Sequence, residues 1–233
     1  MRIALFGYGK MGKMIEGVAL GRNHEIVAKI DVDTLEIDFS NIDVAIDFSM
    51  PQSAFLNIQK CLEHNIPVIC GTTGWLEDYE KVVQLCNEKN GAFIYASNFS
   101  LGVNIFFELN NYLAGMMRNL AQYKVSIEET HHTQKLDAPS GTAITLAEGI
   151  VSNSDYENWK LEGKEEKTVS ITSKRVGNVP GTHVINYESE VDGIEIKHTA
   201  HNREGFALGA VTAAEWIIGK KGVFTMRDVL NMG

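Results

Sequence analysis

A glycine-rich turn near the N-terminus constrains the fold of this chain more than any other feature. Glycines stand at positions 7, 9 and 12, between a short apolar run at residues 2–6 and a helical pattern over residues 10–20. In a strand–turn–helix unit the first glycine permits the tight turn. The second lets the backbone approach a pyrophosphate, and the third lets helix and strand pack closely. The amino end of the helix attracts phosphate. The turn therefore predicts a dinucleotide-binding β-α-β unit.

An acidic residue supports this interpretation and bears on the choice of dinucleotide. Asp31 ends the second predicted strand, at the spacing of about 20 residues after Gly12 that is typical of a ribose 2′-OH ligand. A carboxylate repels a 2′-phosphate and the next residue, Val32, is not basic, so the pair favours NADH. Lys10 and Lys13 at the helix start could attract a 2′-phosphate, which leaves NADPH open. The cofactor-binding residues predicted in this unit are Gly7, Tyr8, Gly9, Lys10, Met11, Gly12 and Asp31.

Strands and helices alternate through residues 1–100. Because parallel strands need a helical crossover between them, this alternation predicts a Rossmann-type, doubly wound parallel sheet. The predicted strands are residues 2–6, 25–31, 44–48, 67–70 and 92–95, and the predicted helices are residues 10–20, 51–62 and 77–89.

Two further loops follow the fourth and fifth predicted strands. Ligands bind at the carboxyl ends of strands in open α/β sheets, so we expect both loops to line the nicotinamide half of the groove. The alternative is ordinary turn chemistry, since the same residue types favour turns. The residues expected to bind the cofactor here are Gly71, Thr72, Thr73, Ala96, Ser97, Asn98 and Phe99.

The pattern changes in the second half of the chain, which predicts an α+β domain with a mixed or antiparallel sheet. The polar stretch 152–167 has no clear period and is interpreted as a surface loop. We assign residues 1–100 to a dinucleotide-binding domain, on which a helix beginning near Phe206 and the rest of 206–233 pack back. Residues 101–205 form a second domain for substrate binding and oligomerisation. Its predicted elements are a helix at 103–120, a strand at 123–129, a helix from Ser140, and antiparallel strands at 169–175, 182–189 and 193–200.

Charge and cysteine content exclude several classes of protein. The net charge of −9 disfavours nucleic acid and anionic membranes as partners. The three cysteines form neither a CxxC pair nor a zinc-ligand spacing, which is typical of a reducing cytoplasm. The apolar run at residues 2–6 is far shorter than the ~20 residues of a membrane span. We therefore expect a cytoplasmic protein.

The densest chemistry lies between His131 and Thr142. His131 and His132 end a predicted strand, Lys135 follows, and Ser140, Gly141 and Thr142 begin a helix whose free N–H groups suit a carboxylate. A lysine offers a point charge to a second carboxylate, and a histidine can transfer a proton near neutral pH. These residue types predict a pocket for a small anionic substrate that requires proton transfer alongside hydride transfer.

Two other interpretations of this segment remain open. Both histidines could be metal ligands, but adjacent side chains on a strand point to opposite faces and chelate poorly, so we predict no metal. Alternatively, the histidines could satisfy hydrogen bonds in the core while the lysine is solvated.

The segment from His131 to Ala143 closely resembles the signature H-H-x-x-K-x-D-A-P-S-G-T-A of the dihydrodipicolinate reductase family. The likeness extends along the whole chain, through the glycine turn, residues 71–74 and 98–104, 177–181 and 224–230. It implies NADH- or NADPH-dependent reduction of 4-hydroxy-tetrahydrodipicolinate to tetrahydrodipicolinate, in lysine and diaminopimelate biosynthesis. It also implies a homotetramer built through the sheet of the second domain.

The resemblance assigns roles to individual residues. His131 is implied as the general acid/base and Lys135 as a second proton donor, with Arg203 and Phe206 approaching the cofactor from the C-terminal side. The residues implied to hold substrate carboxylates are His132, Ser140, Gly141 and Thr142. The chain departs from many members by a shorter stretch at residues 31–43. It also has Val32 where many members carry a base.

Two other classes share the glycine turn, namely a dehydrogenase of the aspartate or homoserine type and a non-catalytic NAD-binding module. Neither has a reason to carry the histidine–lysine segment before Ser140.

Overall fold

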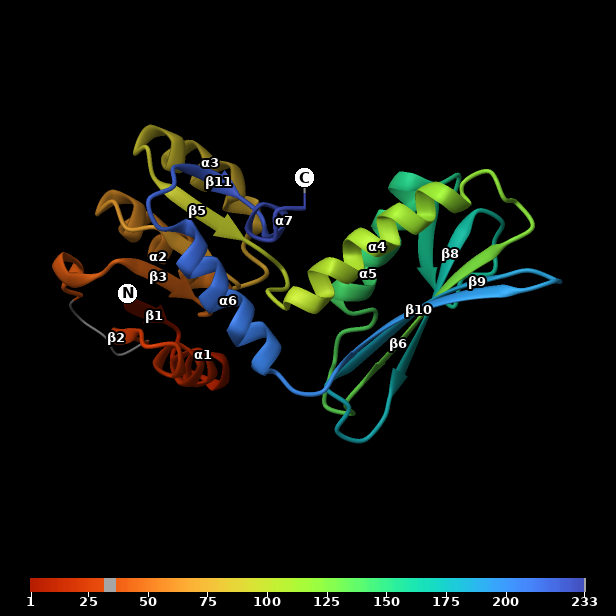
Figure 1. Ribbon diagram of the computed structural model, residues 1–233, viewed down its shortest axis with the longest axis horizontal. Helices are drawn as coiled ribbons and strands as arrows, with labels where there is room; N and C mark the ends of the chain where they lie inside the picture. The colour runs from red at the N-terminus through yellow and green to blue at the C-terminus, as the bar shows by residue number, and fades with distance from the viewer. Residues whose placement is uncertain (32–36, 233) are drawn as a thin grey trace. The chain divides into compact units, whose positions relative to one another are not determined.

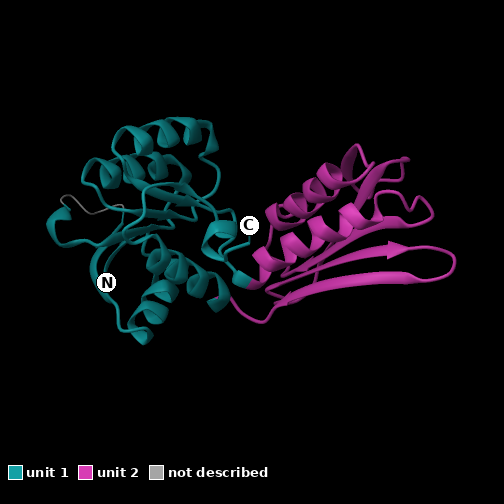
Figure 2. Ribbon diagram, turned by 45° about the horizontal axis from the view of Figure 1, so that its top comes forward, with its two compact units in different colours: residues 1–101, 204–233 teal, residues 102–203 magenta. Residues whose placement is uncertain are grey.

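The computed structural model describes residues 1–31 and 37–232 and divides the chain into two compact units. The first unit comprises Met1–Leu101 and Glu204–Gly233, and the second comprises Gly102–Arg203 (Figure 2). Val32, which entered the argument on cofactor choice, lies outside the described residues. None of the described helices is long and apolar enough to cross a membrane.

The first unit contains a parallel sheet in the order β11-β5-β4-β3-β1-β2 (Figure 1). All of its described strand pairs are parallel, which confirms the predicted Rossmann-type sheet. The strands are β1 (Arg2–Phe6), β2 (Glu25–Ile30), β3 (Val44–Asp47), β4 (Val68–Cys70), β5 (Ala92–Tyr95) and β11 (Gly222–Phe224). The helices are α1 (Lys10–Gly21), α2 (Pro51–Glu63), α3 (Tyr79–Glu88), α6 (Glu204–Ile217) and α7 (Met226–Val229), with short 3-10 turns η1 (Phe39–Asn41) and η2 (Leu76–Asp78).

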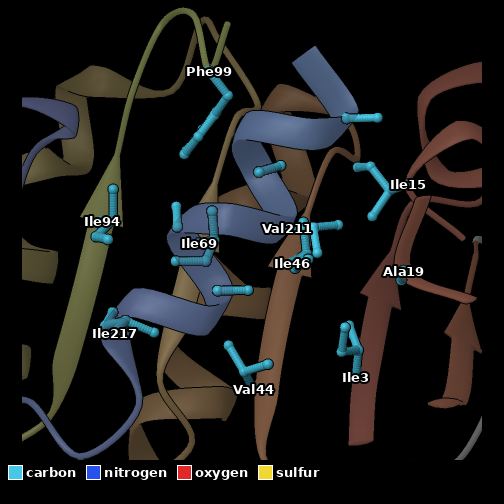
Figure 3. Packing of buried hydrophobic residues seen from close by; sticks show 14 of the residues in the cluster. Ile3, Ile15, Ala19, Val44, Ile46, Ile69, Ile94, Phe99, Val211 and Ile217 are labelled. Carbon is cyan, nitrogen blue, oxygen red and sulfur yellow. The ribbon is translucent and has the colours of Figure 1, made fainter. Parts of the chain in front are cut away.

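Helices cover both faces of this sheet, and the alternation of side chains along each strand supplies both cores. In β1, Ile3 and Leu5 pack with α1 and α6, whereas Ala4 and Phe6 pack with α2 and α3. Figure 3 shows the first of these cores, where Val211 of α6 lies among the isoleucines of the strands. Burial on both faces explains why the strands read as continuous apolar runs.

The end of the chain adds a strand that the sequence analysis did not predict. Gly222–Phe224 forms β11, which pairs in parallel with β5 at the edge of the sheet. Three residues are too few to show a periodicity, so only the pairing with β5 defines this strand. The C-terminal stretch therefore contributes the helices α6 and α7 and the edge strand β11 to the first unit.

The second unit contains a mixed sheet in the order β10-β9-β6-β8-β7, with a helical layer of α4 and α5 packed in its core. The predicted second, mixed sheet is thereby confirmed. Its strands are β6 (Lys124–His131), β7 (Asn158–Leu161), β8 (Thr168–Arg175), β9 (Gly181–Glu188) and β10 (Gly193–Ala200), and its helices are α4 (Leu101–Met117, whose first residue belongs to the first unit) and α5 (Gly141–Asn153).

Two expectations for this unit are wrong. β8 runs parallel to β6 and to β7, not antiparallel, because α5 lies between β6 and the later strands and returns the chain in the same direction. Alternation reports a half-buried strand and carries no information on its direction. The polar stretch 152–167 also contains β7, a short edge strand whose exposed side chains hid it.

Candidate functional site

A pocket of about 430 Å³ lies at the carboxyl ends of β1, β2 and β3, where an open parallel sheet binds its ligands. Gly7, Gly9 and Asp31, which the sequence analysis assigned to the cofactor, line it. Six lining residues were not predicted: Ile30 of β2 and five residues that follow β3, where no motif points to a ligand. Its full lining is Gly7, Tyr8, Gly9, Ile30, Asp31, Phe48, Ser49, Met50, Ser53 and Asn57.

The three glycines of the turn fit a dinucleotide in the way their spacing predicted. Gly7 has a φ of +87°, and a Cβ there would lie 2.3 Å from the carbonyl oxygen of Phe48. A Cβ on Gly12 would lie 2.3 Å from the carbonyl oxygen of Gly7, so α1 and β1 could not approach as they do. At Gly9, by contrast, no described atom lies within 4 Å of a Cβ, and the space is open for a phosphate.

A buried carboxylate orders the loops beside this pocket. Asp47, at the end of β3, accepts from Ser49 N at 3.1 Å, from Asn57 Nδ2 at 2.8 Å and from the hydroxyl of Thr72. Burial raises the pKa of Asp47, and these hydrogen bonds offset part of the effect. The Thr72 hydroxyl also accepts from Ser49 N at 2.8 Å, so its side chain holds two loops together.

The remaining residues assigned to the cofactor differ in how far they are exposed. Thr73 and Ser97 are exposed, Ala96 is half-buried after β5, and Asn98 is buried and accepts from Ser100 N at 2.8 Å. Phe99 is 1% exposed and belongs to the hydrophobic core, where it packs against Phe48. The structure therefore gives Phe99 a place in the core and does not expose it to a cofactor. Gly71 is half-buried, and Lys10 and Met11 lie in the first turn of α1.

The second unit brings the predicted catalytic segment together at the end of β6. His131 is the last residue of the strand, and Ser140 caps α5 by accepting from Ala143 N at 3.2 Å. Lys135 lies in the loop between them and donates to Asp137 at 2.8 Å. One detail of the prediction is wrong. The N–H of Ser140 is not free for a substrate, because it donates to both carboxylate oxygens of Glu129 at 3.1 and 3.2 Å.

Glu129 is a site residue that the sequence analysis missed. Its side chain is 0% exposed, and it accepts from Ser173 Oγ at 2.8 Å and from Arg175 at 3.2 Å. The signal was present in β6, whose inward positions carry Val125, Ile127 and then an acid. A carboxylate in an apolar alternation must be paired, because an isolated buried charge is costly.

Cationic side chains lie around His132. Arg203 lies 3.5 Å from His132 Nε2, and His132 Nδ1 is buried without a hydrogen-bond partner among the described residues. Desolvation lowers the pKa of His132, and the surrounding positive charges, that of Arg203 foremost, lower it further. This arrangement attracts an anion. Arg203 thus lies beside the predicted substrate residues. Phe206 is in α6 and does not line the cofactor pocket.

Glu129, His131 and His183 place one ligand atom each within 4.8 Å of one another, which suits a metal ion in residue type. However, Arg175 donates to the same carboxylate and already neutralises its charge. A divalent cation there would be repelled by the guanidinium and would displace the bonds to Ser140. We interpret the three residues as a hydrogen-bonded network.

A glycine turn at the carboxyl ends of a parallel sheet, and histidine and cationic side chains grouped at the end of β6, are the two parts that a hydride-transfer enzyme for small anions requires. Both occur in this chain, which defines it as a nicotinamide-dependent reductase.

The chain belongs to the dihydrodipicolinate reductase family. Residues 1–99 match the family's N-terminal part and residues 102–230 its C-terminal part. The 4-hydroxy-tetrahydrodipicolinate reductase of Christiangramia forsetii is 58% identical over 99% of this chain and 98% of its own length. That of Neisseria meningitidis serogroup A is 35% identical over 93% and 81%. The predicted family is confirmed.

Solved structures agree in fold. A dipicolinate-bound dihydrodipicolinate reductase from Paenisporosarcina sp. TG-14 covers 97% of this chain and 97% of its own, with a TM-score of 0.76 at 24% identity. An NAD-bound enzyme of gentamicin A biosynthesis, GenD2, covers 94% and 86%, with a TM-score of 0.61 at 8% identity. At these identities the likeness concerns the fold alone.

Proposed function

We propose that this chain reduces 4-hydroxy-tetrahydrodipicolinate to tetrahydrodipicolinate, with NADH as its preferred electron donor and His131 as its proton donor. Membership of the family supports the reaction. The observation that carries the residue assignment is the position of His132 beside the positive charges of Arg203 and Lys135, with its Nδ1 buried and without a hydrogen-bond partner among the described residues.

The substrate is a dianion, and the second unit offers charges to match it. Lys135 and Arg203 supply positive charges around His132, and the guanidinium can bind a carboxylate through two parallel hydrogen bonds. Gly141 and Thr142, in the first turn of α5, add backbone N–H groups and the positive end of the helix. Two carboxylates bound in this way would neutralise the positive charges around His132.

Residues of the first unit fit the dinucleotide. Gly7 to Gly12 would hold the pyrophosphate, and Asp31 would accept from the ribose hydroxyls. Loss of water from the 4-hydroxyl of the substrate leaves a conjugated imine, to which the reduced nicotinamide, when bound, would supply a hydride. The carbon skeleton then needs a proton, which His131 is suited to give, while Lys135 stabilises the negative charge that develops nearby.

The surroundings of the pocket support NADH over NADPH. Asp31 lines the pocket and carries a charge that repels a 2′-phosphate. Besides Lys10 and Lys13 at the start of α1, Lys29, two residues before Asp31, is a base that could attract it. This lysine is held by Glu16 at 2.7 Å and donates to the Tyr8 hydroxyl at 3.0 Å, so its charge is compensated.

The direct test measures oxidation of NADH and NADPH with 4-hydroxy-tetrahydrodipicolinate, for the intact chain and for His131→Ala and Lys135→Ala. We expect kcat to fall about 10²–10⁴-fold for His131→Ala, the usual contribution of general acid catalysis. Lys135→Ala also weakens dipicolinate binding measured by calorimetry. Near-normal kcat in both variants contradicts the assignment. The homotetramer and the cytoplasmic location stay predictions, and light scattering of the purified protein tests the first.

A further inference from the structure

A buried polar network lies behind His131 and connects three parts of the catalytic segment. At its centre, Glu129 is fully buried and holds Ser140 N at the start of α5. Arg175 donates to Glu129 at 3.2 Å and to the backbone carbonyls of Lys135 at 3.2 Å and Asp137 at 2.5 Å. The carboxylate of Glu129 therefore fixes the end of the loop directly, at Ser140. It fixes the middle of the loop through the guanidinium of Arg175.

The same carboxylate faces the ring of His131. Oε2 of Glu129 lies 3.5 Å from His131 Nε2, and the other ring nitrogen, Nδ1, lies 3.3 Å from the carbonyl oxygen of Pro180. A carbonyl only accepts, so Nδ1 carries a hydrogen. A neutral ring would then direct the lone pair of Nε2 at the carboxylate. Only a ring with hydrogens on both nitrogens can donate to the carbonyl and direct an N–H at the carboxylate.

His183 completes the network. Its Nε2 lies 3.2 Å from Ser140 Oγ and 3.4 Å from His131 Nε2. Because Ser140 Oγ accepts from Ala143 N, its hydrogen is left to donate to His183. Burial lowers the pKa of His183 more than Glu129 raises it, so His183 is neutral and its Nε2 accepts. A hydrogen on His131 Nε2 therefore faces the carboxylate of Glu129, and His183 packs beside the ring as the acceptor of the Ser140 hydroxyl.

Positive charges oppose this proton from the surrounding elements. Arg175 comes from β8 and Lys135 from the loop, and both disfavour a second cation beside them. The negative charge of Glu129 offsets them. The titratable and charged groups around His131 are Glu129 of β6, Arg175 of β8, His183 of β9, His132, Lys135 and Asp137 of the loop, and Arg203 at the end of the unit.

We propose that Glu129 and His183 are positioning residues for the reduction, which act through His131 by holding its ring and its proton and which keep Lys135 in register with it. The inference rests on the proposed function of His131. Neither residue touches the substrate in this assignment.

The first test replaces the charge of Glu129 while keeping its shape. In Glu129→Gln we expect kcat to fall about 10- to 100-fold, less than for loss of the acid itself, with a smaller change in KM. The alkaline limb of the kcat/KM profile moves to lower pH by about one unit or more, because the charge that offsets the cations is gone. A purely structural role predicts a lower melting temperature and an unshifted limb.

The second test distinguishes the hydrogen-bond acceptor of the His183 side chain from the volume that this side chain fills. His183→Leu removes the acceptor and shifts the same limb, whereas His183→Gln retains a side-chain carbonyl that can accept and restores much of the activity. The matched control is His198→Gln. His198 is the cross-strand neighbour of His183 on β10 and packs against Phe106, without a described contact to Glu129 or His131. We expect His198→Gln to leave the pH profile of kcat/KM unchanged.

A readout that needs no turnover keeps the two proposals distinguishable. In the free protein, the NMR titration of the His131 ring moves to lower pH in Glu129→Gln and in His183→Leu, and dipicolinate binding persists in both. If the intact chain does not reduce 4-hydroxy-tetrahydrodipicolinate, the proposed function fails while this titration still decides the inference. The inference about Glu129 and His183 is overturned by variants that melt like the intact chain but show no shift in the His131 ring titration and no shift in the alkaline limb of the pH profile.

Discussion

Two glycines of the same turn give opposite predictions, because their surroundings differ. A Cβ on Gly12 would lie 2.3 Å from the backbone oxygen of Gly7, whereas no described atom lies within 4 Å of a Cβ on Gly9. Gly12→Ala therefore tests the packing of α1 against β1. Gly9→Ala tests the space that the pyrophosphate is proposed to occupy.

The magnitudes follow from these contacts. At Gly12 the neighbour is backbone and cannot rotate away, so helix and strand must separate by about 1 Å to reach an ordinary contact, and overpacking of this kind costs about 1–3 kcal/mol. In a chain of this size that lowers the melting temperature by about 2–12 °C. Gly9 is the N-cap of α1 with a φ of −79°, which alanine adopts, so Gly9→Ala costs less than about 1 kcal/mol.

The assay pairs thermal unfolding with titration of NADH. Gly9→Ala should melt within a few degrees of the intact chain and bind NADH at least about tenfold more weakly, since the methyl group blocks hydrogen bonds to a charged phosphate worth about 1.5–3 kcal/mol each. Gly12→Ala should lose stability first. If Gly9→Ala binds NADH as tightly as the intact chain, the pyrophosphate does not lie over Gly9 and the reasoning is refuted.

Two further predictions concern charge. Asp31→Ala and Glu16→Gln each raise kcat/KM for NADPH relative to NADH, the first by removing a repulsive carboxylate and the second by freeing Lys29, and an unchanged ratio in both contradicts the assigned preference. Hydrogen bonds from Arg22 hold the pKa of Glu215 below its usual range. The contribution of this ion pair to folding stability is therefore present above the unfolded pKa of about 4.3, and it is lost as pH falls through the lower pKa of the folded state. At pH 3 we expect Glu215→Gln to have about the same free energy of unfolding as the intact chain. At pH 7 we expect its free energy of unfolding to be lower by up to ~1 kcal/mol, because the pair is partly exposed.

The sequence by itself determined the nucleotide half of this protein. The glycine spacing, the apolar strands and Asp31 are local signals, because each depends on backbone geometry and burial within one β-α-β unit. The signature from His131 to Ala143 is likewise continuous in the chain, so its residues could be assigned together. The structure places them at one strand end and one helix start.

Tertiary structure decided what depends on neighbours distant in sequence. The direction of β8, the strand β11 and the burial of Phe99 follow from pairing and packing that no local pattern records. His183 reaches His131 only because β9 pairs with β6. Glu129 was visible in the sequence, yet its partner Arg175 comes from β8, which pairs with β6 on the side opposite to β9. A buried charge acquires its meaning from the groups that compensate it, and the fold alone brings those together.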